Sequence, residues 1–312
     1  MSLASILASD TVGQVVAKQK EGDGLVSALK GEELGSVAIR MAKKRISAVP
    51  VFEDASKESC LGLVDFADIV SALLRKFERD MNQLRNKETF WDSLTRIRIE
   101  EAIDASGKNS ANEIPYDAPL KLATQMFAQL GVKRLLVIDA SRKVVGILSP
   151  SALTSHSIAR LRGILDPALN NTVEKLNMGN SPVISVTKSR PFLEALVLMR
   201  ETMHSCVAVV DDTTNTLAGS VSMSDIKMIF IMEDFSLLTM PCWDFIVLSR
   251  SLQDTEQFPF FGVSMESKVL SVISKLLATH VHHVYVVDGA QKPKRVIGFS
   301  DVCKALSTAA AG

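Results

Sequence analysis

The chain of 312 residues contains one layout four times, and this repetition limits its possible folds more than any other feature. Each copy has a short apolar strand that ends in an acid, a polar turn, a second strand and a helix start. A repeat of about 60 residues is too small to bury its sheet and helix faces alone, so the copies are expected to pair. The four copies are KRISAVPVFEDASKESCLGLVDFADIV, GVKRLLVIDASRKVVGILSPSAL, MHSCVAVVDDTTNTLAGSVSMSDI and HVHHVYVVDGAQKPKRVIGFSDV.

A segment with helical periodicity lies upstream of each pair of strands. In the second copy Leu120, Ala123 and Phe127 fall on one face, and Pro119 suits the first helical turn. Each unit is therefore expected to run strand, helix, strand, strand, helix, which makes the fold class α/β (α+β).

Composition excludes several functions. Lys and Arg balance Asp and Glu at 35 each, so no overall charge attracts nucleic acid or a membrane surface. The longest apolar stretch, MIFIMEDFSLLTM, is interrupted by Glu233 and Asp234 and is too short for a membrane span. The N-terminal sequence lacks the pattern of a secretory signal, and the four cysteines lack CxxC spacing. We expect a reduced protein of the cytosol or nucleus.

Motifs for common catalytic mechanisms are also missing. The sequence has no GxxxxGK[ST], GxGxxG, HExxH or GxSxG, and no cluster with metal-ligand spacing. An enzyme that acts on a nucleotide is the less favoured interpretation, because neither an activated nucleophile nor a phosphate-cradling glycine loop is present. We expect no catalytic residue, no metal and no catalytic cofactor.

The second strand and helix start of each copy resemble the CBS domain, whose motif reads G-h-h-[ST]-x-x-D. GSVSMSDI fits it fully, with Ser222 and Asp225 in the last two specified places. The first copy has Asp65 where Ser or Thr is usual, the second has Ala152 in place of the Asp, and the fourth has Gly298 in the Ser/Thr place. The resemblance covers about residues 10 to 310.

A narrower resemblance is to the gamma regulatory subunit of AMP-activated (SNF1-type) protein kinase. It rests on VLSVISKLLATHVHHVYVVD, on KETFWDSLTRIRIEEAI and on the missing acid of the second repeat. It implies four CBS repeats in two tandem Bateman modules that form a disc-like assembly. The expected boundaries are residues 10–76, 111–165, 175–235 and 258–310 for the repeats, with a helical linker at 77–110. Breaks are expected near 105–115, 165–180 and 250–262, and helix is expected over most of 70–104.

The repeated acid predicts a ribose-binding site. A carboxylate in the first turn of a helix is favoured by the helix dipole, and it can accept hydrogen bonds from the two ribose hydroxyls. The candidates are Asp68, Asp225 and Asp301. Ala152 cannot accept a hydrogen bond, so the second site should be empty or very weak.

The phosphates would need donors at the strand entrances, which in the family face the central channel of the disc. Solvated strand-entry charges are the alternative interpretation of the same residues. Ser47 stands near the usual place of an Arg, and the carboxylate of Asp65 would repel a phosphate, so the first site is in question. Pro150 is a further departure. The phosphate-binding candidates are His282, His283, Lys133, Arg134, Arg45, Ser149 and Ser222.

The resemblance therefore implies a non-catalytic subunit that binds AMP, ADP or ATP as regulatory ligands. Its expected partners are the catalytic and scaffold subunits of a kinase, with no nucleic acid and no membrane. The alternative is a CBS-domain regulator of a different enzyme or a transporter.

Overall fold

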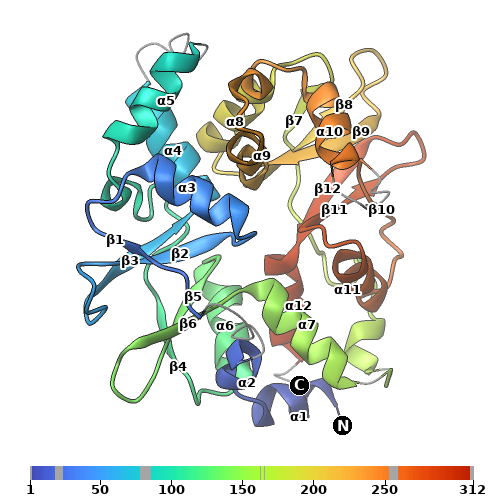
Figure 1. Cartoon of the computed structure of the whole chain (residues 1–312). Coiled ribbons are helices and arrows are strands. Elements are labelled where there is room, and N and C mark those ends of the chain that lie inside the picture. The colour runs from blue at the N-terminus through green and yellow to red at the C-terminus, as the bar shows by residue number, and fades with distance from the viewer. Residues whose placement is uncertain are drawn as a thin grey trace. The chain divides into compact units, whose positions relative to one another are not determined.

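The computed structural model describes residues 2–17, 24–77, 86–161, 163–164, 166–252 and 259–309 (Figure 1). In these ranges the chain forms four three-stranded sheets with one topology: the first strand pairs parallel with the second, and the second pairs antiparallel with the third. The sheets contain β1 (Ala28–Leu29), β2 (Ala48–Phe52) and β3 (Cys60–Asp65); β4 (Glu113–Pro115), β5 (Leu135–Ile138) and β6 (Val144–Leu148); β7 (Ser185–Thr187), β8 (Cys206–Val210) and β9 (Leu217–Ser222); and β10 (Gly262–Val263), β11 (His283–Val287) and β12 (Pro293–Gly298).

Each sheet carries a helix between its first and second strands and another helix after its third strand. The α-helices are α1 (Leu3–Ser9), α2 (Val12–Ala17), α3 (Leu34–Lys43), α4 (Phe66–Lys76), α5 (Lys87–Arg96), α6 (Leu120–Leu130), α7 (Pro150–Leu161), α8 (Phe192–Glu201), α9 (Lys227–Met232), α10 (Cys242–Ser251), α11 (Val269–Ala278) and α12 (Phe299–Ala309). The short 3-10 helices are η2 (Ile99–Ala102), η3 (Pro167–Asn170), η4 (Met223–Ile226) and η5 (Phe235–Leu238). The order expected for the repeated unit is confirmed.

The acids that end the second strands form the turns that follow. In all four repeats one carboxylate oxygen accepts a hydrogen bond from the backbone N–H two residues on, and an irregularity of register lies at the same place in each strand pair. Such side-chain bonds stabilise tight turns. These acids therefore have a local structural role. The pairs are Asp54 with Ser56 (2.9 Å), Asp139 with Ser141 (2.8 Å), Asp211 with Thr213 (3.1 Å) and Asp288 with Ala290 (2.9 Å).

The chain divides into two compact units, each with its own apolar core. Unit 1 comprises residues 1–25, 112–183 and 261–312, and unit 2 comprises 26–111 and 184–260. Unit 1 thus holds the second and fourth repeats, and unit 2 holds the first and third. These groupings cut across the tandem order of the chain. The disc-like arrangement of all four repeats stays a prediction.

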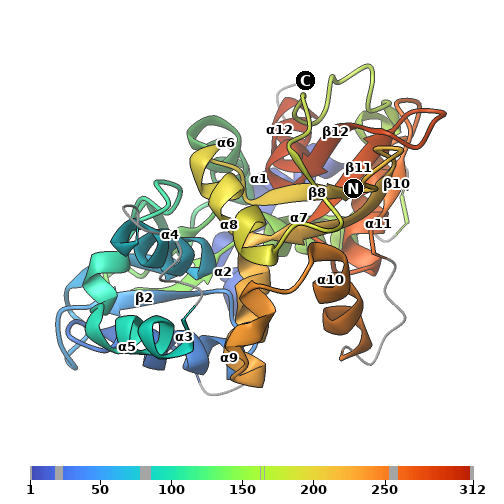
Figure 2. The same ribbon diagram turned by 90° about the horizontal axis from the view of Figure 1, so that it is seen from above.

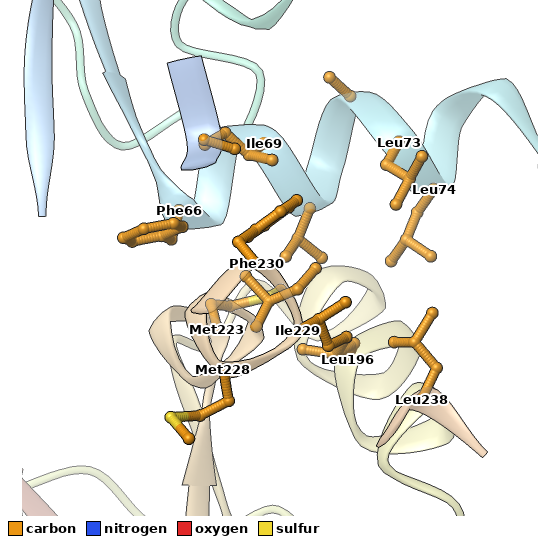
Figure 3. Packing of buried hydrophobic residues seen from close by; sticks show 14 of the residues in the cluster. Phe66, Ile69, Leu73, Leu74, Leu196, Met223, Met228, Ile229, Phe230 and Leu238 are labelled. Atoms are coloured by element: carbon orange, nitrogen blue, oxygen red, sulfur yellow. The ribbon is translucent and has the colours of Figure 1, made fainter. Parts of the chain in front are cut away.

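In the core of unit 2, α4 of the first repeat packs against helices of the third repeat. Figure 3 shows Phe230 of α9 pointing toward α4, where its ring lies 6.4 Å from that of Phe66. Leu196 of α8 and Met223 of η4 contribute to the same buried cluster. On another side of this unit α3 lies beside both α5 and α9 (Figure 2).

The described part of the linker between the first two repeats is partly helical. It contains α5 and η2, and α5 packs on the third repeat through Phe90, whose ring lies 5.1 Å from Phe235. Residues 78–85 lie outside the described ranges, as does part of the expected break at 250–262.

In unit 1 the N-terminal helices α1 and α2 pack against α6, α7 and β6. Val16 lies so close to Gly146 of β6 that a Cβ there would come within 2.1 Å of its Cγ1 atom. The buried Asp10 accepts hydrogen bonds from Arg160 Nε (2.8 Å), and His156 Nε2 lies 2.9 Å from its carboxylate. This N-terminal segment therefore buries its apolar face against the second repeat, and the expected start of the first repeat at residue 10 stays a prediction.

Candidate functional site

The third strand of every repeat runs directly into a helix, and three of these junctions place a carboxylate in the first helical turn. One oxygen of each carboxylate accepts a hydrogen bond from the backbone N–H three residues earlier. This bond satisfies a donor at the helix start, and it fixes the orientation of the carboxylate. The bonds are Asp65 N to Asp68 Oδ2 (2.9 Å), Ser222 N to Asp225 Oδ2 (2.7 Å) and Gly298 N to Asp301 Oδ2 (3.0 Å).

In the third repeat the carboxylate of Asp225 is half-buried. The Ser222 hydroxyl donates to its Oδ2 atom (2.9 Å) and lies 2.9 Å from the Ser224 hydroxyl. Among the described residues none donates to Oδ1 of Asp225. The junction therefore leaves Oδ1 of Asp225 as an oriented acceptor. Ser222, predicted to bind phosphate, instead donates its hydroxyl to Asp225, the residue predicted to bind ribose.

The fourth repeat brings together several predicted residues at the start of α12. His283 pairs with Gly298 across the two strands, and its ring lies against that glycine. The exposed His282 meets the ring of Phe299 edge-on at 6.0 Å. Asp301 follows in the same turn and is 8% exposed, with its Oδ1 atom 3.8 Å from Lys304 Nζ.

A cation of the second repeat also reaches this junction. Lys133 Nζ donates to the Ser300 hydroxyl at 3.2 Å, next to Asp301. The structure thus groups an acceptor, two imidazoles and an ammonium at one helix N-terminus, where the dipole favours an anion. Of the predicted candidates, four lie here: Asp301, His282, His283 and Lys133.

The second repeat itself has no acid at its junction. Ser149 caps α7 instead, because its hydroxyl accepts a hydrogen bond from Ala152 N (3.2 Å). Pro150 takes the first helical position, where its missing N–H costs nothing. Arg134 donates through one guanidinium nitrogen to the carbonyl of Lys133 at 2.8 Å.

The first repeat differs most from its counterparts. Asp68 is fully buried, and it accepts hydrogen bonds from Ser106 N (2.9 Å) and Asn109 Nδ2 (2.6 Å) in addition to its capping bond. Burial, reinforced by the charge of Asp65, raises the pKa of Asp68 to about 7. Arg45 lies exposed after α3 with a φ of 54°.

Sequence reasoning missed Ser106 and Asn109. The polar run DASGKNS signalled only a break between repeats, and nothing in its spacing pointed to Asp68. Among the described residues no group of acids, histidines and cysteines could hold a metal ion. None of the described helices is both long and apolar enough to span a membrane.

The CBS domain family model matches residues 23–75 and 174–231. Protein SDS23 of Podospora anserina is 26% identical over 256 residues, which cover 78% of this chain and 50% of that protein. Protein sds23 of Aspergillus niger is 29% identical over 253 residues, which cover 76% of this chain and 49% of its own. The chain thus spans about half the length of these curated relatives.

The same fold occurs in a crystal structure of protein MJ1225 from Methanocaldococcus jannaschii, which has been proposed as an archaeal homologue of g-AMPK. The TM-score is 0.71 with 13% sequence identity, over 95% of this chain and 99% of that one. The CBS domain model thus matches segments of the first and third repeats, and the chain shares its fold with MJ1225.

Proposed function

We propose that this chain is a non-catalytic regulatory subunit that senses AMP, ADP and ATP in its CBS clefts and belongs to an AMP-activated (SNF1-type) kinase complex of the cytosol or nucleus. The main support for this proposal is the junction at α12, where Asp301 lies beside His282, His283 and Lys133. A carboxylate suits a ribose diol, and the imidazoles with the ammonium suit a phosphate.

The third repeat offers a second candidate acceptor for a ribose diol at its junction. Asp225 presents one oriented oxygen that no described residue uses, in the one junction that fits the CBS motif fully. Ala152 leaves the second repeat without a diol acceptor. We therefore expect the nucleotide to bind at the third and fourth repeats in preference to the second.

Sensing requires only that the nucleotides bind two states of the protein with different affinities. A ligand that contacts Asp301 in one repeat and Lys133 in another would stabilise their mutual packing within unit 1. AMP and ATP differ in phosphate length and charge, so they would stabilise this arrangement unequally. The kinase partner follows from the sequence resemblance, and the likeness to MJ1225 supports it through the fold.

The first test is calorimetry of AMP with single variants. Asp225→Ala and Asp301→Ala should each weaken binding by about tenfold to a hundredfold, which corresponds to about 1.5 to 3 kcal/mol for a lost charged hydrogen bond. Ala152→Ser is the matched control and should leave affinity unchanged. Unchanged affinity and stoichiometry in both Asp variants would remove the ribose role.

The phosphate role needs a separate comparison. Lys133→Ala and the double substitution of His282 and His283 by Gln should weaken AMP but leave adenosine, which lacks phosphate, nearly unaffected. Equal losses for both ligands would indicate damage to the fold. A structural role alone would then explain the residues.

The partner is tested by mixing the purified chain with SNF1-type catalytic and scaffold subunits and following co-elution. Co-elution would support the kinase-subunit assignment. Nucleotide binding without co-elution would favour the alternative, a CBS-domain regulator of another enzyme or transporter.

A further inference from the structure

The loop of residues 104–110, here called the plug loop, covers the junction of the first repeat. Both oxygens of Asp68 accept hydrogen bonds from it: Oδ1 from Ser106 N at 2.9 Å and Oδ2 from Asn109 Nδ2 at 2.6 Å. The side chain of Asn109 is 1% exposed, and Asp68 is fully enclosed. Asp225 in the third repeat is half-buried and accepts only from Ser222 among the described residues.

The plug loop has a defined internal structure. Asp104 Oδ1 accepts from Asn109 N at 2.7 Å, and Asp104 O accepts from Gly107 N at 2.9 Å. Asp104 and Gly107 both have positive φ, 48° and 69°, a conformation that closes a tight turn. The loop therefore presents Ser106 N and the Asn109 amide toward Asp68 as a preformed pair of donors.

Contacts with two repeats hold the plug loop in place. On the first repeat, Asp104 N donates to Leu63 O at 3.3 Å, and Ile103 packs on Gly62, where a Cβ would come within 2.5 Å. On the third repeat, Lys108 Nζ donates to the carbonyl of Met203. The loop is thus fastened to both repeats of unit 2.

The donor pair has the same chemistry as a ribose diol, since both present two neighbouring hydrogen-bond donors to one carboxylate. We propose that the plug loop is an intramolecular competitor that occupies the diol acceptor of the first repeat, so this cleft accepts a ligand only when the loop has left. This inference rests on the proposed function of the junction carboxylates. In this proposal, the linker that contains the plug loop determines which clefts can bind a ligand.

The chemistry of the first junction also restricts its ligand. Asp65 caps α4 with its carboxylate, which accepts from Ala67 N (2.8 Å) and Asp68 N (3.1 Å). This charge stands where the third repeat has the neutral Ser222. A phosphate would be repelled, so the uncovered cleft should take an uncharged molecule with a vicinal diol, of which adenosine is a suitable probe.

The test uses the full chain with Asp225→Ala and Asp301→Ala, so that the first cleft is observed alone. At pH 8, above the folded pKa of Asp68, Asn109→Asp removes a donor and places a second carboxylate against the ionised Asp68, which should expel the loop. Hydrogen exchange of residues 104–110 should accelerate, and adenosine affinity should rise by about tenfold or more, as for one charge-assisted hydrogen bond made available. Asn215→Asp, the same charge change on an exposed turn of unit 2, is the control and should change neither measurement.

Faster exchange without a gain in adenosine affinity would overturn the proposal, as would unaltered exchange. Asn109→Ala removes the donor without adding charge and serves as the second variant if the Asp form misfolds. The parent chain, with Asp225 and Asp301 intact, is titrated with AMP in parallel. If the parent fails to bind AMP while the opened variant gains adenosine, the proposed function fails and the plug loop stands.

Discussion

Substitution of Asp68 by Asn should flatten the pH dependence of the stability of unit 2. The folded state raises the pKa of Asp68 from its ordinary 3.8 to about 7, through burial and then through the charge of Asp65. The folded chain keeps this proton up to about pH 7, whereas the unfolded chain releases it near pH 3.8. The stabilising contribution is therefore complete below pH 3.8 and is lost as the pH rises through 7.

The magnitude follows from the distance between the assay pH and the folded pKa. From pH 5 to 7 there are two pKa units of about 1.36 kcal/mol each, so the free energy of unfolding should fall by about 2.5 kcal/mol between pH 5 and 8 from this group alone. Asp68 is fully enclosed, so little solvent screening reduces the value. In Asp68→Asn this component should vanish.

The assay is urea unfolding at pH 5, 6, 7 and 8, followed by tryptophan fluorescence. Both tryptophans, Trp91 and Trp243, lie in unit 2. Asp68→Ala is the companion variant: it should be less stable than Asp68→Asn at every pH, because it leaves the donors of the plug loop unpaired, but it should share the flattened slope. Parallel curves for the parent and both variants would refute the assignment of this proton to Asp68.

Other substitutions test the packing. Gly146→Ala should lower the stability of unit 1 by about 1 to 3 kcal/mol, measured by thermal circular dichroism, because the new methyl group would overlap Val16; Val16→Ala in the same chain should restore much of the loss. Asp10→Asn should cost about 3 kcal/mol by the same measurement, since the buried His156 would lose its charged partner. His280→Gly should add about 0.5 to 1 kcal/mol, because this exposed residue has a φ of 54°, which glycine adopts without strain; no gain would show that the strain is negligible.

The repeated fold was predictable because its signals are local. Strand alternation, the acid that forms the turn and the position of the next helix all lie within one repeat, and the structure has them four times. The equivalence of Asp225 and Asp301 could be predicted for the same reason, because each accepts a hydrogen bond from a backbone N–H only three residues earlier in the chain. Their role toward a ribose stays a prediction.

Contacts between residues far apart in the chain could not be predicted from the sequence. The donors to Asp68 lie 38 and 41 positions further along the chain, in a run whose Ser, Gly and Asn residues signal any polar turn. Likewise, hydrophobic spacing in residues 3–16 indicates a buried face but does not name the repeat that covers it. Lys133 was a candidate because of its strand entrance, whereas its contact with Ser300 depends on how the second and fourth repeats pack.

The interleaving of the two units has a consequence for synthesis on the ribosome. Unit 1 draws on residues 1–25, 112–183 and 261–312, so its N-terminal helices and second repeat are made long before the fourth repeat that completes their core. Folding in which distant segments must meet is slow, and unpaired apolar faces are prone to aggregate meanwhile. The nascent chain must carry such faces until nearly all of it has emerged, which makes this fold a natural client for chaperones that shield apolar surface during translation.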